Sequence, residues 1–286
     1  MKFTLFLLIP ILCFGQIKRN YPPVIEDAQA YIYKKASDTD LKLWVYSPEQ
    51  NQKKTAVILF FFGGGFRSGS PEQFTPQARY FASRGITSIV ADYRVYSRNN
   101  VKPIDCVSDA MAAVQWVRKN AVKLNIDSNK IIASGGSSGG YLAAATYFVD
   151  KKVTNNMDPT NVKPNALLLF NPGGMDLSAM NEESFLARFG ATKNDVNLIE
   201  LIKGNAPPTL ILHGDNDKVV NIKTVRNFSK KMHSIGNKCD LIEYMDQPHG
   251  FFNYGRLNNG PFYHTISSAD AFLREIEFIP PFPEFR

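Results

Sequence analysis

The 286-residue sequence contains only three cysteines, at positions 13, 106 and 239. Cys13 lies in an N-terminal segment that is treated below, so two remain for the folded protein. Two cysteines cannot form a disulfide framework, and neither stands at a spacing from histidine that is typical of a zinc site. We therefore expect no metal site, and we expect Cys106 and Cys239 to be buried free thiols rather than a disulfide.

Long apolar runs are also scarce, and the clearest one lies at the N-terminus. Lys2 precedes a mostly apolar stretch over residues 3–14, and residues 13–15 offer a small-x-small cleavage site. The run is shorter than the roughly 20 residues that a membrane-spanning helix needs, and its layout is that of a secretory signal peptide. We expect cleavage of residues 1–15, a single domain over residues 16–286, a secreted or periplasmic location, and no stable membrane insertion afterwards.

The sequence has no segment in which charge of one sign gathers. The net charge is +7, but the basic residues are scattered as pairs. Such a pattern is typical of a solvated surface and does not predict a nucleic-acid partner. Neither a glycine–lysine phosphate loop nor a Gly-x-Gly-x-x-Gly spacing is present, so we expect no cofactor. The sequence leaves the oligomeric state open.

What the sequence does have is a regular alternation of short apolar runs and amphipathic stretches. Ser70 and Gln73 predict a capping box for the first helix, and residues 38–40 predict a turn between two early strands. Alternating strands and helices predict an α/β protein, with a mostly parallel twisted sheet of about eight strands and helices on both faces. After the two early strands, strands are expected at 56–62, 86–92, 130–134, 166–170, 208–214 and 239–244, and helices at 70–85, 103–124 and 221–236.

One apolar strand runs directly into the stretch "GGSSGG" (135–140), after which a helix is expected. A strand, Gly-x-Ser-x-Gly and a helix together predict the sharp turn called a nucleophile elbow, which exposes a serine hydroxyl. The motif fits twice, so Ser137 and Ser138 are both candidates from the residues alone. A phosphate-binding loop or a plain turn is the alternative, and the glycine spacing does not favour it.

A serine nucleophile needs a base, and the base needs an orienting acid. Among the four histidines, His249 is the best candidate because "DQPHGFFNY" follows a late strand directly. Asp217 in "HGDNDKVV" follows the preceding strand, and we place it ahead of Asp215, which we interpret as a turn or capping group. The chain order Ser, Asp, His is the one expected for a sheet of this kind.

Three glycines follow another strand, in "FFFGGGF" (60–66). Backbone amides of glycine can approach a substrate closely because no Cβ intervenes. Two such amides, with the amide of the residue after the nucleophile, could stabilise a tetrahedral oxyanion. A flexible turn is the simpler alternative, and the nearby elbow motif makes it the weaker one.

These motifs resemble the α/β-hydrolase family, and within it the secreted bacterial esterases related to hormone-sensitive lipase and to acetylxylan esterases. The resemblance covers nearly the whole mature chain and is carried by "FGGGF", "DYR" (92–94), "GGSSGG", "HGDNDKVV" and "PHGF". Aligned with the family's elbow, it implies that Ser137 is the nucleophile. It further implies that the amides of Gly64, Gly65 and Ser138 form the oxyanion hole.

The sequence departs from the family in two places. Phe62 replaces the histidine that usually braces the glycine loop, so we expect packing to hold this loop. No long helical cap precedes the loop, and only residues 173–206 leave room for a lid, which suggests an open site. The resemblance thus implies hydrolysis of short-acyl esters, above all acetyl esters, with plant or algal polysaccharides as candidate substrates. A serine peptidase of the prolyl-oligopeptidase type and a non-catalytic binding protein on the same fold are the alternatives.

Overall fold

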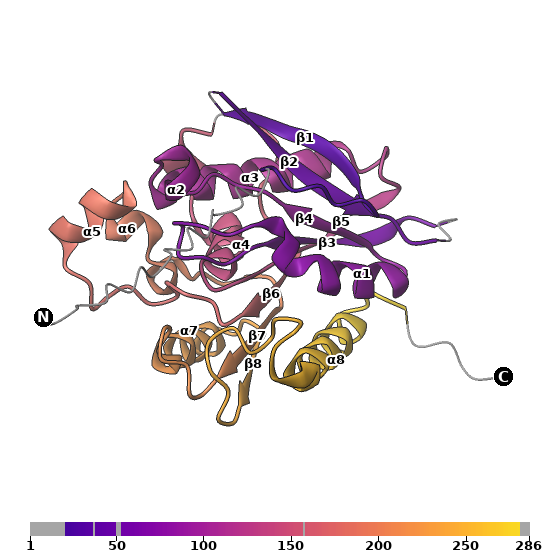
Figure 1. Cartoon of the computed structure of the whole chain (residues 1–286). Helices are drawn as coiled ribbons and strands as arrows, with labels where there is room; N and C mark the ends of the chain where they lie inside the picture. Colours follow the sequence, from indigo (N-terminus) through magenta and orange to yellow (C-terminus); the bar gives the residue numbers. More distant parts are fainter. Residues whose placement is uncertain (1–20, 37, 50–52, 157, 281–286) are drawn as a thin grey trace, which may run out of the picture.

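A computed structural model describes residues 21–36, 38–49, 53–156 and 158–280. The expected signal peptide, residues 1–15, lies outside the described residues. One sheet of eight strands runs in the order β1-β2-β4-β3-β5-β6-β7-β8 (Figure 1). The strands are β1 (Gln29–Ala36), β2 (Thr39–Tyr46), β3 (Thr55–Phe61), β4 (Thr87–Ala91), β5 (Ile126–Gly136), β6 (Ala166–Phe170), β7 (Thr209–Gly214) and β8 (Cys239–Tyr244).

Only β2 breaks the parallel arrangement of the sheet. It pairs antiparallel with β1 and with β4, whereas every pair from β4 to β8 is parallel. Parallel strands bring their carboxyl ends to one edge, so the loops after β3, β5, β7 and β8 meet there. The expected α/β-hydrolase sheet, mostly parallel and eight-stranded, is confirmed.

Helices cover both faces of the sheet, as Figure 1 shows. Three helices pack with one buried cluster, namely α3 (Pro103–Lys119), α4 (Ser138–Phe148) and α7 (Ile222–Ser234). The other cluster includes residues of α1 (Thr75–Ser83) and α8 (Gly260–Glu275). Strand β3 supplies Leu59 and Phe61 to the first cluster and Ile58 and Phe60 to the second. Burial on both faces explains its uninterrupted apolar sequence.

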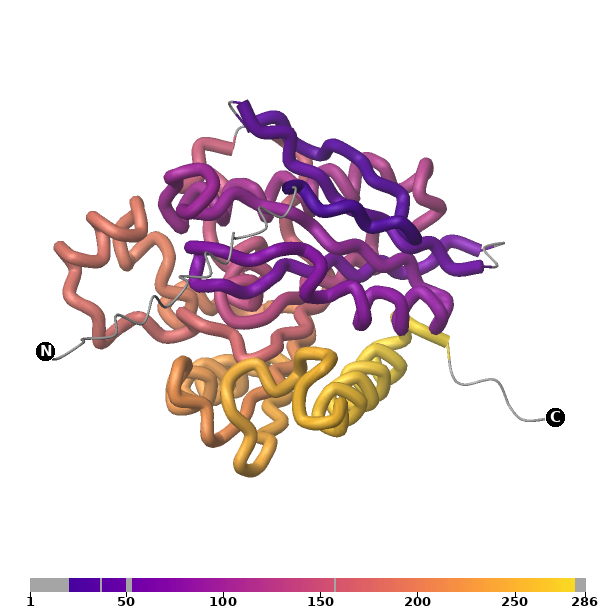
Figure 2. Tube along the Cα trace, in the orientation of Figure 1, coloured from indigo at the N-terminus to yellow at the C-terminus, as the bar shows by residue number. Residues whose placement is uncertain are grey.

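Short helical segments occupy the chain between β6 and β7, where the sequence leaves room for a lid. Figure 2 shows this part of the chain extending away from the sheet at the left of the view. It contains α5 (Glu182–Phe189), α6 (Lys193–Val196) and the 3-10 helix η3 (Leu198–Leu201). The remaining short helices are η1 (Pro71–Phe74), α2 (Tyr96–Asn99), η2 (Lys151–Thr154) and η4 (Leu257–Asn259).

The turn between β1 and β2, expected at 38–40, is shorter than predicted, because β2 already begins at Thr39.

Cys106 and Cys239 are buried and unpaired, as expected, and burial raises the pKa of both thiols. Within the described ranges, no helix combines the length and apolarity that a membrane crossing requires. The same ranges contain no group of three or more His, Cys, Asp or Glu residues that could hold a metal ion.

Candidate active site

The stretch "GGSSGG" forms a sharp turn between β5 and α4. Ser137 stands at this turn with φ 54° and ψ −120°, a conformation that a non-glycine residue adopts only when its surroundings impose it. Its amide donates to the carbonyl of Phe170, and its own carbonyl accepts from the amide of Gly173. A Cβ at Gly139 would lie 2.1 Å from the Phe61 carbonyl oxygen, so the turn also requires a glycine there.

The two serines of this turn lie in different surroundings. Ser138 is buried, with 4% of its surface exposed, whereas Ser137 is partly accessible. Ser138 opens α4, and amides in the first turn of a helix have no partner within the helix. The geometry therefore presents the Ser137 side chain and the Ser138 amide at the carboxyl edge of the sheet, as an elbow requires.

Asp217 and His249 come together from the loops that follow β7 and β8. His249 Nδ1 lies 2.7 Å from Asp217 Oδ2, a hydrogen-bond distance. The Asp217 side chain is fully buried, while 22% of the His249 side chain is exposed. Phe252, three residues after His249, packs on the elbow, because a Cβ at Gly136 would lie 2.5 Å from its ring. The histidine loop is thus packed against the serine turn.

Besides His249, three donors hold the Asp217 carboxylate. Val219 and Val220 donate their amides to Oδ1 at 2.8 and 2.9 Å, and Asn171 Nδ2 donates to Oδ2 at 2.9 Å. Burial alone would raise the pKa of this carboxyl, but the hydrogen bonds from His249 and the two amides outweigh it, and the pKa lies below its ordinary value. The acid therefore remains ionised and fixed in orientation at neutral pH.

Two residues near Asp217 had no assigned part in the sequence analysis. Asn171 follows β6 directly, and nothing in its sequence context signals a contact 46 residues away. His213 is fully buried; its Nε2 lies 3.4 Å from Asp217 Oδ2 and 3.0 Å from the carbonyl oxygen of Val220. Burial lowers the pKa of His213, which keeps it neutral beside the acid. The other two histidines lie in α7 and α8.

The glycine loop after β3 presents two backbone amides. Gly64 and Gly65 have φ values of 138° and 62°, which favour glycine. A Cβ at Gly64 would lie 2.1 Å from the carbonyl oxygen of Ser68. Among the described residues, no acceptor is bonded to the amides of Gly64 and Gly65. Both amides are therefore available to a ligand.

The amide of Gly63 is already occupied, and its partner corrects one prediction. Gln73 Oε1 accepts from Gly63 N at 2.6 Å, and Gln73 Nε2 donates to Asn253 Oδ1 at 2.9 Å. Ser70 does cap this segment, since its side chain accepts from the Glu72 amide, but the expected capping box is wrong because the Gln73 side chain points to the glycine loop instead. Asn253 Nδ2 in turn donates to the carbonyl of Gly250, next to His249. Gln73 thus ties the glycine loop to the histidine loop.

Phe62 occupies the position of the missing bracing histidine, and it is held by Tyr93. The two rings are stacked with centroids 4.0 Å apart, as the expectation of packing implies. In addition, the Tyr93 hydroxyl donates to the Phe62 carbonyl at 2.7 Å. Arg98 donates to the carbonyl of Gly69 at the far end of the loop. The loop is therefore braced by a hydrogen bond that Gln73 accepts and by two that Tyr93 and Arg98 donate, as well as by packing.

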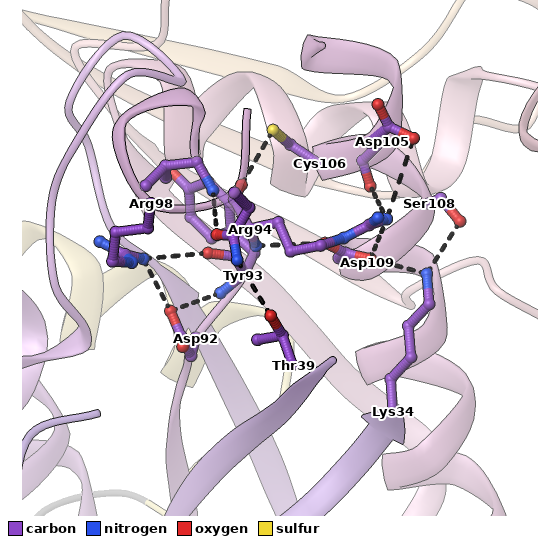
Figure 3. A network of polar contacts seen from close by, with 12 residues as sticks. Lys34, Thr39, Asp92, Tyr93, Arg94, Arg98, Asp105, Cys106, Ser108 and Asp109 are labelled. Carbon is purple, nitrogen blue, oxygen red and sulfur yellow. Dashed lines mark hydrogen bonds and ion pairs between the residues drawn. The ribbon is translucent and has the colours of Figure 1, made fainter. Parts of the chain in front are cut away.

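Tyr93 belongs to the "DYR" stretch, whose polar network Figure 3 shows. Asp92 accepts from the Tyr93 amide at 2.8 Å and from Arg98 at 3.2 Å. Burial raises the pKa of Asp92 to about 6, although these contacts and one from Tyr21 oppose the rise. Arg94 forms an ion pair of 2.8 Å with the buried Asp109 on α3. The stretch therefore holds Tyr93 and Arg98 in place, and these two residues donate hydrogen bonds to the glycine loop.

Taken together, the serine turn, the aspartate–histidine pair and the free amides supply the components of acyl transfer. The elbow offers a partly exposed hydroxyl, His249 lies beside an ionised carboxylate that could orient it as a base, and Gly64, Gly65 and Ser138 offer amides. Ser137, Asp217 and His249, the candidate nucleophile, acid and base, thus all lie in turns or loops at the carboxyl edge of the sheet.

Comparisons with known proteins agree with this chemistry. The BD-FAE family model matches residues 43–232. The native structure of esterase Est2 from Thermogutta terrifontis is similar, with 42% identity, a TM-score of 0.89, and coverage of 93% of this chain and 99% of that chain. A propionate-bound structure of the same esterase has 42% identity and a TM-score of 0.88, and covers 92% of this chain and 100% of that chain.

Curated proteins show more distant similarity. The "Probable carboxylic ester hydrolase LipM" of Mycobacterium tuberculosis is 24% identical over 255 residues, which cover 82% of this chain and 58% of that protein. The "Acetylxylan esterase" of Xylanibacter ruminicola is 28% identical over 240 residues, which cover 79% of this chain and 47% of that protein. The chain therefore spans three fifths or less of the length of these curated relatives.

Proposed function

Because the chain belongs to the BD-FAE family, and with it to the α/β-hydrolase esterases, we propose that it hydrolyses carboxylic esters with Ser137, His249 and Asp217 as catalytic triad. The observation that carries the proposal is the buried, ionised Asp217 at 2.7 Å from His249, in a loop that packs against the strained Ser137 turn. A structural role for the same contacts would not require a serine held at positive φ.

In the first half of the reaction, Ser137 Oγ attacks the carbonyl carbon of the ester. His249 Nε2 takes the hydroxyl proton, and Asp217 keeps the other ring nitrogen protonated and stabilises the imidazolium that forms. Negative charge develops on the former carbonyl oxygen, and the amides of Gly64, Gly65 and Ser138 stabilise it by donating hydrogen bonds. His249 then gives the proton to the leaving alcohol, and an acyl-serine remains.

In the second half, water replaces the alcohol. His249 removes a proton from this water, whose oxygen attacks the acyl carbon, and the same amides stabilise the second oxyanion. Collapse of this intermediate returns the proton from His249 to Ser137 and releases the carboxylic acid. The chain's own residues supply each of these proton transfers, and the mechanism needs no cofactor.

We further propose short-acyl esters, above all acetyl esters, of plant or algal polysaccharides as substrates. Two relatives whose names refer to xylan support the proposal. They are the acetylxylan esterase and the "Endo-1,4-beta-xylanase B" of Butyrivibrio fibrisolvens, which is 26% identical over 222 residues. The N-terminal pattern supports it as well, because large glycans must be met outside the cell. A prolyl-oligopeptidase-type peptidase is less well supported, since the similar proteins are named as esterases.

A panel of esters tests both levels of the proposal. We expect turnover of 4-nitrophenyl acetate, slower turnover of a long-chain ester, no turnover of a peptide amide, and release of acetate from acetylated xylan. If no ester is hydrolysed, the esterase function is wrong and a binding role gains support. If only the peptide amide is cleaved, the peptidase alternative is correct. Turnover of 4-nitrophenyl acetate without acetate release from any acetylated glycan would remove the polysaccharide proposal alone.

Gln73 gives a second test, because it positions the amides without contacting substrate. Gln73→Ala removes the acceptor for Gly63 N and the hydrogen bond to Asn253, so we expect kcat to fall about tenfold to a hundredfold. This decrease is no larger than the one that removal of an oxyanion-hole donor typically causes, about 10² to 10³. KM should change little, because the amides act on the transition state. A purely structural role would lower the melting temperature and leave kcat at low temperature unchanged.

The conservative variant separates the two contacts of Gln73. Gln73→Glu keeps an oxygen for Gly63 N but places a second acceptor against Asn253 Oδ1. We expect it to retain most of the kcat that Gln73→Ala loses. Equal losses in both variants would show that the bond to Asn253 on the histidine loop, rather than the bond to Gly63, is the one that matters.

A further inference from the structure

A cavity of about 620 Å³ opens beside the glycine loop. Gly65 borders it, as do Tyr141 on α4 and Gly174 in the loop after β6. The residue before Gly174 approaches the serine turn, since a Cβ at Gly173 would lie 3.8 Å from the Ser137 carbonyl carbon. A larger hollow of about 1060 Å³ lies at the amino ends of β3 and β5, at the opposite edge of the sheet. Of these two cavities, the smaller one therefore adjoins the proposed site.

Aromatic residues line this cavity; Tyr141, Phe185 and Phe189 are buried behind its wall, while Phe66 and Tyr96 are accessible. Phe66, Tyr141 and Phe189 contact one another edge to face, with ring centroids 5.7 to 6.1 Å apart. Phe185 stacks on Phe189 at 4.8 Å. The Tyr141 ring is fixed, because its hydroxyl donates to the carbonyl of Val196 at 2.8 Å. These buried rings support Phe66, which presents an apolar surface that suits the apolar face of a ring-shaped ligand.

Three cationic side chains line the same cavity, and no carboxylate does. They are Arg67, Lys102 and Arg188, and among the described residues none of them forms an ion pair. Asp105, three residues after Lys102, does not line the cavity; it accepts from the Lys102 backbone amide at 3.0 Å and lies 3.9 Å from Arg94. The lining therefore has three positive charges that no carboxylate of the cavity itself compensates.

We propose that this cavity binds the alcohol part of the ester, and that this part is an anionic ring such as a uronic acid residue of an acetylated glycan. The inference rests on the proposed ester hydrolysis. An acetyl group has two carbons and cannot fill the cavity, which leaves the space to the glycan. The accessible rings of Phe66 and Tyr96 contact the sugar face. Arg67, Lys102 and Arg188 attract its carboxylate, so these three cations determine specificity.

A matched pair of small esters tests the preference for an anion. The substrates are 4-(acetoxymethyl)benzoate and benzyl acetate, which have the same acyl group and nearly the same leaving oxygen but differ by one carboxylate. We expect kcat/KM to be about tenfold higher for the anionic ester, since each exposed ion pair contributes a factor of about two to five. The ratio should fall towards one in 0.5 M NaCl, because salt screens exposed charges.

Substitutions identify the source of this preference. In Arg67→Gln/Lys102→Gln/Arg188→Gln we expect the ratio to fall towards one, and each single substitution should lower it in part if the triple variant does not fold. The control is Lys223→Gln/Lys230→Gln/Lys231→Gln, which removes the same charge from exposed residues of α7, a helix that does not line the cavity. This control should keep the wild-type ratio.

The outcomes separate this inference from the esterase proposal. If both esters are hydrolysed at equal kcat/KM, or if the triple variant keeps the preference, the anionic-ligand inference is overturned and the esterase function stands. If neither ester is hydrolysed, the esterase function itself fails. A third comparison sets mono-4-nitrophenyl adipate against 4-nitrophenyl hexanoate. A preference for the adipate that the same three substitutions remove would assign the cavity to the acyl part and overturn the alcohol assignment.

On natural material, the inference predicts a difference between two forms of one polymer. Acetylated polygalacturonate should release acetate faster than the same polymer whose carboxylates have been converted to methyl esters. The methyl-esterified polymer has the same sugar and the same acetyl groups, so charge is the variable. Equal acetate release from both would contradict a uronic acid as the bound ring.

Discussion

Ser137→Ala is expected to lower kcat for 4-nitrophenyl acetate by about 10⁴ to 10⁶, the range in which removal of a serine nucleophile leaves only binding and the oxyanion hole. Alanine keeps the Cβ and the backbone, so the turn at φ 54° should still form. The measurement is steady-state kinetics together with the melting temperature. Loss of activity with an unchanged melting temperature would place the effect on chemistry rather than on folding.

Ser138→Ala is the matched control, because it removes the same group one residue away. The proposal assigns only the amide of residue 138 to the oxyanion hole, and alanine retains it, so kcat should stay within about tenfold of the wild type. Paraoxon offers a second readout, since an Est2 structure is described as phosphorylated by this compound. We expect covalent addition to the wild type and to Ser138→Ala but not to Ser137→Ala. The reverse pattern would make Ser138 the nucleophile.

The distinction between these serines illustrates what the sequence can and cannot predict. Two glycines on each side satisfy the elbow motif in both frames, and the residues alone leave both open. The structure adds a property of the backbone: Ser137 stands at positive φ and is partly accessible, while Ser138 is buried at the start of α4. Accessibility depends on how β6 and the histidine loop close around the turn, which no local pattern encodes.

The strands and the triad loops were predictable because each depends on local signals. Apolar runs, terminal glycines and the order Ser, Asp, His lie within short stretches of sequence. Gln73, Tyr93 and Asn171 were not predicted as supports, because their partners lie 10 to 180 residues away in the chain. Gln73 even satisfied a local rule, the capping box, and the tertiary contact to Gly63 prevailed over it.

Asp217→Asn is the second substitution for which we expect a large loss, about 10⁴ in kcat. Oδ2 of Asp217 accepts from His249 Nδ1 at 2.7 Å and from Asn171 Nδ2 at 2.9 Å. An asparagine can keep an oxygen towards the amides of Val219 and Val220, but its NH₂ group then faces two donors. His249 can accept this NH₂ only in the tautomer that leaves Nε2 protonated, and a protonated Nε2 cannot remove the serine proton.

Asp215→Asn is the control for this substitution, since Asp215 is the exposed alternative two residues earlier. Within the part of the chain that the structure describes, its carboxylate accepts one hydrogen bond, from the backbone amide of Asp246, and the side-chain oxygen of asparagine can accept the same bond. We expect kcat within about twofold of the wild type. A large loss in Asp215→Asn with little loss in Asp217→Asn would move the orienting acid to position 215.

The pH dependence of the wild type provides an independent check on Asp217. Hydrogen bonds hold its pKa below the ordinary 3.8 in the folded protein, so the unfolded chain takes up a proton before the native state does. Its contribution to stability is therefore complete above that ordinary value and is lost as the pH falls through the lower, folded-state pKa. Asp217→Asn should accordingly lose stability relative to the wild type at pH 7, and this difference should shrink as the pH is lowered below 4. A difference in unfolding free energy that grows towards acid would mean that the folded protein favours the protonated acid, and the ionised triad would then be wrong.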